Sequence, residues 1–284
     1  MKKVFSLMLL LATIFTFTSC GGDDEPQVQP KLTQFDYTIF AGESTPVKGE
    51  ALENLTWEGD NFVAEIDNKG ILHANKTGYA RIWSKDITGG DLTNIRVVVT
   101  PRNTSFSEPL LYHSGVGSQI KYEDGYFKFD PMSYGSMPKA DMWGIMSSFI
   151  THYIKECGLP WTLYKQDASS MIFKTDKSAS PYVIYLFDSN REVVAAGVYI
   201  NPLQMNSLPD FLNERYLIYD VDTSNYTANF AHAIGYSGEP IVDYVGQMGY
   251  SSSLGLVIIA YTKGGDASRS NNNEFMDVLK NIEL

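Results

Sequence analysis

Residues 61–84 read NFVAEIDNKGILHANKTGYARIWS, and this stretch decides the fold of the first part of the chain. Phe62, Ala64 and Ile66 alternate with Val63 and Glu65, which fits the two-residue period of a β-strand. The turn sequences DNKG and KTG separate this strand from two further short strand patterns. Strands this short and this regularly spaced predict a β-sandwich.

The strand pattern extends outward from this stretch to residues 31–102. A β-branched run at residues 95–100, IRVVVT, closes it directly before Pro101. A sandwich buries the inward-facing side chains of both of its sheets. We therefore expect four apolar residues in the core: Trp57, Ile71, Ile82 and Val97.

The longer stretch LTWEGDNFVAEIDNKGILHANKTGYARI resembles the group 2 bacterial Ig-like domain. That family has a Trp, a Val-Ala pair, an Asp-x-x-Gly turn and a Thr-Gly-x-Ala sequence before the next strand. The residues at these places are Trp57, Val63, Ala64, Asp67, Gly70, Thr77, Gly78, Ala80 and Ile82. The resemblance implies an Ig-like stalk or adhesive module of a cell-surface protein, and it supplies no catalytic residue.

The N-terminus has the pattern of a signal peptide at residues 1–19. Lys2 and Lys3 precede an apolar run at residues 4–17, and this order is typical of a secretory signal that is removed from the mature protein. The run is shorter than the roughly 20 apolar residues of a membrane-spanning helix. We therefore leave these residues out of the fold.

Cys20 follows this signal directly, and FTSC at residues 17–20 resembles the lipobox of bacterial lipoproteins, with Phe17 in place of the usual Leu. The resemblance implies that Cys20 is lipidated and anchors the protein in the membrane. Residues 20–30 form an acidic, polar tether that is similar to those of surface-exported lipoproteins of the Bacteroidetes type, which implies the outer face of the outer membrane. An ordinary signal peptide followed by a solvated linker is the alternative.

The composition limits the class of protein and its partners. The chain has 284 residues, of which 44% are hydrophobic and 19% charged, values typical of a folded chain with room for two domains. The net charge of −11 argues against nucleic acid as a partner. Beyond Cys20 the sole cysteine is Cys157, so we expect no intrachain disulfide.

Residues 103–284 predict a second, α+β domain of a family that the sequence does not identify. ADMWGIMSSFITHYIKECGLP, at residues 140–160, has helical spacing, with Asp141 as the expected N-cap and Gly158 at the end. Further helices are expected at residues 209–215 and 271–284. The expected strands are at residues 171–175, 182–187, 192–200, 216–221, 226–232 and 254–262. Helix, three strands, helix, three strands, helix predicts an antiparallel sheet with helices packed on one face, and suggests an internal duplication.

No catalytic, cofactor or metal motif is visible in the sequence. The four histidines, none of which has the spacing of a metal-ligand pair, are His73, His113, His152 and His232. Cys157 follows an apolar helical stripe, which predicts a buried and inert thiol. Asp220 and Asp222 share one face of a strand, which predicts a solvated surface, with half of a calcium site or a catalytic pair as alternatives.

Tyr, Ser, Gly and Asn are abundant in the second domain, and these residues are typical of adaptable binding surfaces. The function that we predict is binding of an extracellular ligand, either a glycan or a protein, with no cofactor. A hydrolase that uses dispersed Asp and Glu residues is one alternative, so enzymatic activity stays open. A cell-envelope assembly or adhesion subunit is the other. A cleft with two carboxylates favours the hydrolase, an aromatic platform favours glycan binding, and an exposed edge strand favours assembly.

Replacement of Cys20 by Ala tests the anchor. Because the acyl chains can attach to the protein only through this thiol, Cys20→Ala is expected to move the protein out of the membrane fraction. Fractionation of cells followed by immunoblotting measures this shift. Membrane retention equal to that of the unaltered protein would exclude Cys20 as the anchor.

Overall fold

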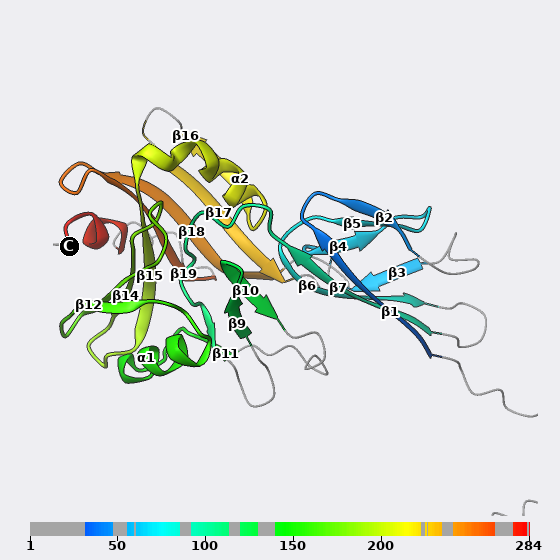
Figure 1. Ribbon diagram of the computed structural model, residues 1–284, viewed down its shortest axis with the longest axis horizontal. Coiled ribbons are helices and arrows are strands. Elements are labelled where there is room, and N and C mark those ends of the chain that lie inside the picture. The colour runs from blue at the N-terminus through cyan, green and yellow to red at the C-terminus, as the bar shows by residue number, and fades with distance from the viewer. Residues whose placement is uncertain are drawn as a thin grey trace, which may run out of the picture.

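The computed structural model describes residues 32–47, 56–59, 61–85, 92–113, 120–129, 140–222, 225, 227–234, 241–264, 275–282 and 284. The predicted signal peptide, Cys20 and the tether at residues 20–30 lie outside these ranges. The described chain consists mostly of β-sheet, in two assemblies that lie next to each other along the long axis (Figure 1). None of the described helices is both long and apolar enough to cross a membrane.

The N-terminal strands form two sheets that enclose one core, which confirms the expectation of sandwich-like sheets; we call this part the sandwich. Its strands are β1 (Leu32–Phe40), β2 (Ser44–Pro46), β3 (Thr56–Gly59), β4 (Ala64–Ile66), β5 (Ile71–Ala74), β6 (Gly78–Lys85) and β7 (Leu92–Thr100). One sheet has the order β1-β7-β6-β3 and the other β2-β5-β4. The stretch at residues 61–84 supplies β4, β5 and most of β6, in both sheets.

The core of the sandwich contains two of the four predicted residues. Ile82 and Val97 are buried, with exposed fractions of 2% and 0%. Ile71 and Trp57 are only half-buried, so the prediction was wrong for them. In β5 the inward positions belong to Leu72 and Ala74, which forces Ile71 outward. Trp57 lies on the edge strand β3 and packs against the core from its margin.

β1 and β7 are parallel, and this pairing orients the sandwich. Leu32 lies beside Leu92 and Phe40 lies beside Thr100. The chain therefore enters the sandwich at one end and leaves it at the other, where the second assembly begins (Figure 1). Nine residues of extended strand span about 30 Å.

The segment after the sandwich contains the short strands β8 (Tyr112–His113), β9 (Ile120–Glu123), β10 (Tyr126–Phe129) and β11 (Ala140–Asp141). Asp141 belongs to β11, so its predicted role as a helix N-cap is wrong. Gly144 has a φ of +78°, which a right-handed helix does not accommodate, and α1 (Ser147–Glu156) begins after it with Met146 as the N-cap.

Gly158 ends α1 as predicted. Its φ is +75°, its N–H donates to the carbonyl of Lys155, and the N–H of Leu159 donates to the carbonyl of Ile154. These two bonds define a Schellman motif.

The second assembly is built on an eight-stranded antiparallel sheet, which we call the large sheet. Its strands are β12 (Thr162–Gln166), β13 (Ser170–Lys174), β14 (Tyr182–Phe187), β15 (Val193–Ile200), β16 (Leu217–Asp222), β17 (Thr227–Ile234), β18 (Ile241–Ser251) and β19 (Leu256–Lys263). The sequence predicted six of them and missed β12 and β18. All five residues of β12 are exposed, so no buried face marks it, and Gly246 and Gly249 interrupt the apolar pattern of β18.

The large sheet has two halves with the same order of elements. α1 precedes β12 to β15, whereas the 3₁₀ helix η2 (Pro202–Ser207) and the helix α2 (Leu208–Asn213) precede β16 to β19. The halves meet where β15 pairs with β19, so the order is β12-β13-β14-β15-β19-β18-β17-β16. The repeated order predicted from the sequence is therefore present, with four strands in each half in place of three.

Helices lie on both faces of the large sheet, so the prediction of helices on one face was wrong. Ile154 of α1 and Phe211 of α2 belong to the core on one face. The helix at residues 275–280 packs on the opposite face, where Leu279 shares a second core with Ile184 and Ala260. The inner strands are apolar on both sides. In β19, for example, successive residues alternate between the two cores. Because both faces are apolar, each of them needs a cover.

Gly246 tests the packing of the large sheet. A Cβ atom at this position would lie 2.0 Å from the ring of Phe230, which is fully buried. Gly246→Ala is expected to lower the free energy of unfolding by about 1–3 kcal/mol, because overpacking displaces a core ring. Chemical denaturation measures the change. Val242→Ala, at a 45% exposed site of the same strand, is the control, and equal stability of the two variants would contradict the predicted clash.

Candidate functional site

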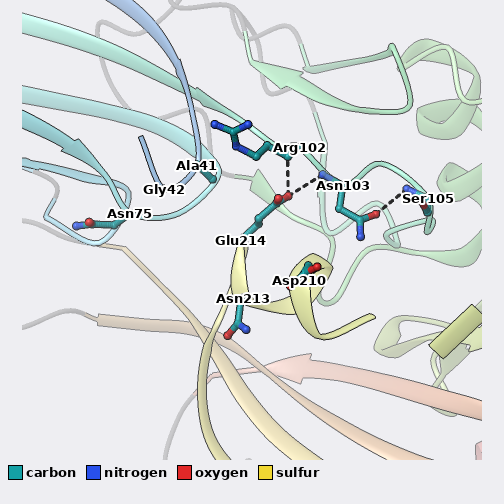
Figure 2. Close-up of a pocket in the computed structure, with 9 residues that line it drawn as sticks. All are labelled: Ala41, Gly42, Asn75, Arg102, Asn103, Ser105, Asp210, Asn213 and Glu214. Carbon is teal, nitrogen blue, oxygen red and sulfur yellow. Dashed lines mark hydrogen bonds between the residues drawn. The ribbon is translucent and has the colours of Figure 1, made fainter. Parts of the chain in front are cut away.

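A cleft of about 580 Å³ opens where the sandwich meets the large sheet. Turns at the end of the sandwich form one wall, and α2 with the residue after it forms the other (Figure 2). The lining residues are mostly polar: Ala41, Gly42, Asn75, Arg102, Asn103, Ser105, Asp210, Asn213 and Glu214. We call it the junction cleft.

Glu214, the C-cap of α2, fastens the two walls together. One oxygen of its carboxylate, Oε2, accepts hydrogen bonds from the backbone N–H groups of Arg102 and Asn103, each at 3.0 Å (Figure 2). Its backbone carbonyl accepts a third bond from the N–H of Thr77, at 2.7 Å. In addition, the ammonium group of Lys76 donates to the carbonyl of Asn213 at 2.5 Å. A turn of the sandwich and the start of the linker are thus tied to the end of one helix.

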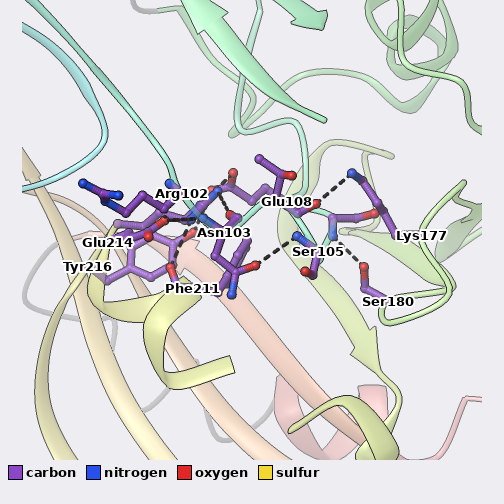
Figure 3. Close-up of polar contacts among 12 residues, drawn as sticks. Arg102, Asn103, Ser105, Glu108, Lys177, Ser180, Phe211, Glu214 and Tyr216 are labelled. Atoms are coloured by element: carbon purple, nitrogen blue, oxygen red, sulfur yellow. Dashed lines mark hydrogen bonds and ion pairs between the residues drawn. The ribbon is translucent and has the colours of Figure 1, made fainter. Parts of the chain in front are cut away.

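Arg215 lies beneath these hydrogen bonds, and its side chain is 3% exposed. Its Nε lies 3.0 Å from Oε2 of Glu108, its Nη1 lies 3.4 Å from Oε2 of Glu214, and its Nη2 donates to the carbonyl of Asn103. Its guanidinium carbon lies 3.9 Å from the centre of the Phe211 ring. Figure 3 shows these partners gathered between the linker and α2.

Burial and ion pairing act in opposite directions on Arg215. Burial disfavours the charged guanidinium, but the carboxylate of Glu108 favours it, and the net effect raises the pKa of Arg215 above its ordinary value. The side chain therefore stays charged, and its partners must stay in place to compensate the charge.

The linker after the sandwich is held along the face of the large sheet. The ammonium group of Lys177 donates to the carbonyl of Thr104 at 2.7 Å, and the N–H of Ser107 donates to Oγ of Ser180 (Figure 3). Further along, the N–H of Leu110 donates to the hydroxyl of Tyr185 at 2.8 Å. The junction cleft therefore has walls of fixed geometry.

The groups that face the junction cleft suit a hydroxyl-rich ligand. Asp210, Asn213 and Ser105 are exposed and lie on both walls (Figure 2). Arg102 forms an ion pair with Glu43, and its guanidinium lies 5.2 Å above the ring of Phe40, which is 47% exposed. Carboxylate, amide and hydroxyl groups together both donate and accept hydrogen bonds.

The structure does not gather the four histidines into one site among the residues that it describes. His73 bridges Ser44 and Asp67 on the sandwich. His152 lies exposed on α1 near Glu156, and His113 lies in β8, with its side chain outside the described set. No group of three or more His, Cys, Asp or Glu side chains that would hold a metal occurs in the described part of the chain.

His232 is part of a polar cluster that sequence reasoning missed. Its Nδ1 lies 3.3 Å from Oδ2 of Asp243, which also accepts a hydrogen bond from the hydroxyl of Tyr112. The imidazole stacks on Tyr244, with ring centres 4.7 Å apart, and meets the edge of Phe62 from the sandwich. No local motif marks this cluster, because the pairing of β17 with β18 and the junction bring its members together. The neighbouring rings make it a second contact across the junction.

Cys157 and the two aspartates have the surroundings that the sequence predicted. Cys157 is 1% exposed, and burial raises the pKa of its thiol to about 11, so the reactive thiolate is scarce at neutral pH. Asp220 and Asp222 are exposed on one face of β16, where they accept hydrogen bonds from Asn229 and Asn225.

Many of the described aromatic residues in the second assembly lie in its two cores or pack against them. Four fully buried tyrosines lie under α1, α2 and the helix at residues 275–280: Tyr185, Tyr199, Tyr216 and Tyr261. Tyr164 is 51% exposed and lies near Tyr182, but their rings are inclined by 49° and make no flat platform. Tyr134 and Tyr236 lie outside the described residues.

No family model matches this chain, and a search of curated proteins finds no significant match. Function is therefore inferred from the residues of the chain itself.

Substitution of Glu214 tests whether its hydrogen bonds stabilise the junction. Glu214→Ala leaves the N–H groups of Arg102 and Asn103 without this acceptor and removes one partner of Arg215, so we expect a loss of about 1–3 kcal/mol in the free energy of unfolding. Denaturant titration measures it. Asp210→Ala, one helical turn away and exposed in the same cleft, is the matched control and should change stability by less than about 0.5 kcal/mol. Equal effects of the two changes would show that Glu214 has no special structural role.

Proposed function

We propose that this protein is a lipid-anchored protein of the outer face of the outer membrane that binds an extracellular glycan in the junction cleft. Cys20 carries the anchor, residues 20–30 form the tether, and the sandwich is the stalk. The observation that best supports an outward position of the cleft is the parallel pairing of β1 with β7. A chain anchored before residue 32 has the large sheet and the cleft at the opposite, outward end of the stalk.

The finer assignment of the fold is part of the same proposal. The sandwich is a group 2 bacterial Ig-like domain, as the residues from Trp57 to Ile82 indicate. Two sheets around one core, and the turn at Asp67 and Gly70, agree with that resemblance. Residues 103–284 form an α+β binding domain that packs its helices around an antiparallel sheet.

The chemistry of the junction cleft favours a neutral glycan over a charged ligand. Asp210 and Glu214 line it together with Arg102 and three asparagines, so opposite charges lie side by side. Sugar hydroxyls donate to carboxylates and accept from amide and guanidinium groups. The net charge of −11 repels anionic ligands over longer distances.

Binding without hydrolysis fits the state of the two carboxylates. A pair of carboxylates that hydrolyses a glycoside needs one as the acid and the other as the base or nucleophile. Glu214 uses one carboxylate oxygen for two backbone N–H groups and lies near Arg215, so it serves to hold the junction together. A hydrolase with Asp210 and another acidic residue is the alternative.

A glycan array probed with the full-length protein in detergent tests this proposal. We expect retention of a neutral oligosaccharide class without release of product. Asp210→Ala and Asn213→Ala should each weaken the binding by about tenfold. Each change removes one hydrogen bond to the glycan, made by the carboxylate of Asp210 or by the side-chain amide of Asn213. Asp277→Ala, on the exposed surface of the C-terminal helix, is the control.

Two results would contradict the proposal. Unchanged affinity in both cleft variants would place the ligand elsewhere, and cleavage of the retained glycan that stops in Asp210→Ala would identify the hydrolase alternative.

A further inference from the structure

The large sheet ends at β16, and this edge is exposed. Within the described chain, β16 pairs with β17 on one side and with no strand on the other. Three of its apolar side chains reach into solvent: Leu217 and Val221 are each 57% exposed, and Tyr219 is 47% exposed. A strand edge of this kind offers backbone N–H and C=O groups to an added strand.

The opposite edge of the large sheet, β12, carries a protection against strand addition that β16 lacks. β12 carries Lys165 next to a bulge at Tyr164, and a lysine and a bulge are common protections of sheet edges. β16 also has a bulge, at Tyr219, but it contains no Lys, Arg or Pro. After the bulge, the residues from Asp220 to Asp222 pair with β17 in regular register.

The charge of this edge indicates what binds there. Asp220 lies opposite Asn229 and Asp222 lies opposite Thr227, so both carboxylates are on one face of the sheet at the rim. β16 and β17 themselves contain no Lys or Arg. Two copies of β16 paired edge to edge would bring four carboxylates together, and this repulsion disfavours a second copy as the occupant.

We propose that β16 is a strand-addition site for an extended, basic segment of a partner protein. In strand addition, main-chain hydrogen bonds supply affinity and side chains at alternate positions supply specificity. Lys or Arg side chains of the added strand would lie beside Asp220 and Asp222, and its apolar side chains would cover Leu217 or Val221. This interaction is independent of the junction cleft and of any glycan.

A short synthetic peptide of alternating valine and lysine, labelled with a fluorophore, is the probe. Fluorescence anisotropy with the full-length protein should show saturable binding. The double change Asp220→Lys, Asp222→Lys should weaken it by at least about tenfold, because two attractive cross-strand pairs become repulsive. Leu163→Lys on the β12 edge is the matched control and should leave the affinity unchanged. Thermal melts of both variants show that they are folded.

A second peptide separates strand addition from simple attraction of charges. The same sequence with N-methyl groups on alternate amides keeps its charge but cannot donate along the pairing edge, and we expect it not to bind. Equal binding of the methylated peptide, or unchanged binding in the double variant, would overturn the proposal. Sedimentation that shows a dimer of the unaltered protein, lost on Val221→Lys, would overturn it in favour of a second copy.

Discussion

The buried guanidinium of Arg215 is the constraint on which the arrangement of the two assemblies depends. A charge removed from water is tolerated only when carboxylates and carbonyls surround it. Its partners come from the linker, through Glu108 and Asn103, and from the end of α2, through Phe211 and Glu214. The linker must therefore pass over α2 at this point. Glu214 is then in position to bind the backbone at Arg102, and the direction of the sandwich follows from that contact.

A junction fixed in this way determines which surfaces are available for function. One face of the large sheet is covered by α1, α2 and the linker, and the helix at residues 275–280 packs on the other. Tyr185, Tyr199, Tyr216 and Tyr261 are buried in these cores, whereas Tyr164, Tyr219 and Tyr250 remain exposed. Polar, accessible groups then remain at the junction, where turns of the sandwich face α2, and along the strand edges. The candidate site consequently lies between the two assemblies.

The sequence predicted what depends on local pattern and missed what depends on distant contacts. The strands from β4 to β6 and the end of α1 at Gly158 follow from alternation and from a glycine with positive φ, both of which are local. The start of α1 was misplaced because Gly144 breaks the helical pattern that Asp141 seemed to cap. Glu214 reaches backbone groups about a hundred positions earlier in the chain. Nothing in the residues around Glu214 marks it as part of a site, and the same holds for His232 and Asp243.

The junction and the edge strand β16 have different physical situations, and this difference bears on how the protein is used. Next to the sandwich, backbone donors and buried charges are paired, so ligands there meet a surface that does not need to rearrange. At β16 the sheet ends, and no further strand of the described chain pairs with its outer edge. Apolar side chains of β16 remain in water beside two carboxylates. Exposed edges favour aggregation, and natural proteins usually block them with lysine, proline or a covering segment. The acidic edge β16 has a bulge but no lysine or proline, so repulsion is its main protection against its own copies, and that repulsion disappears when the incoming strand is basic.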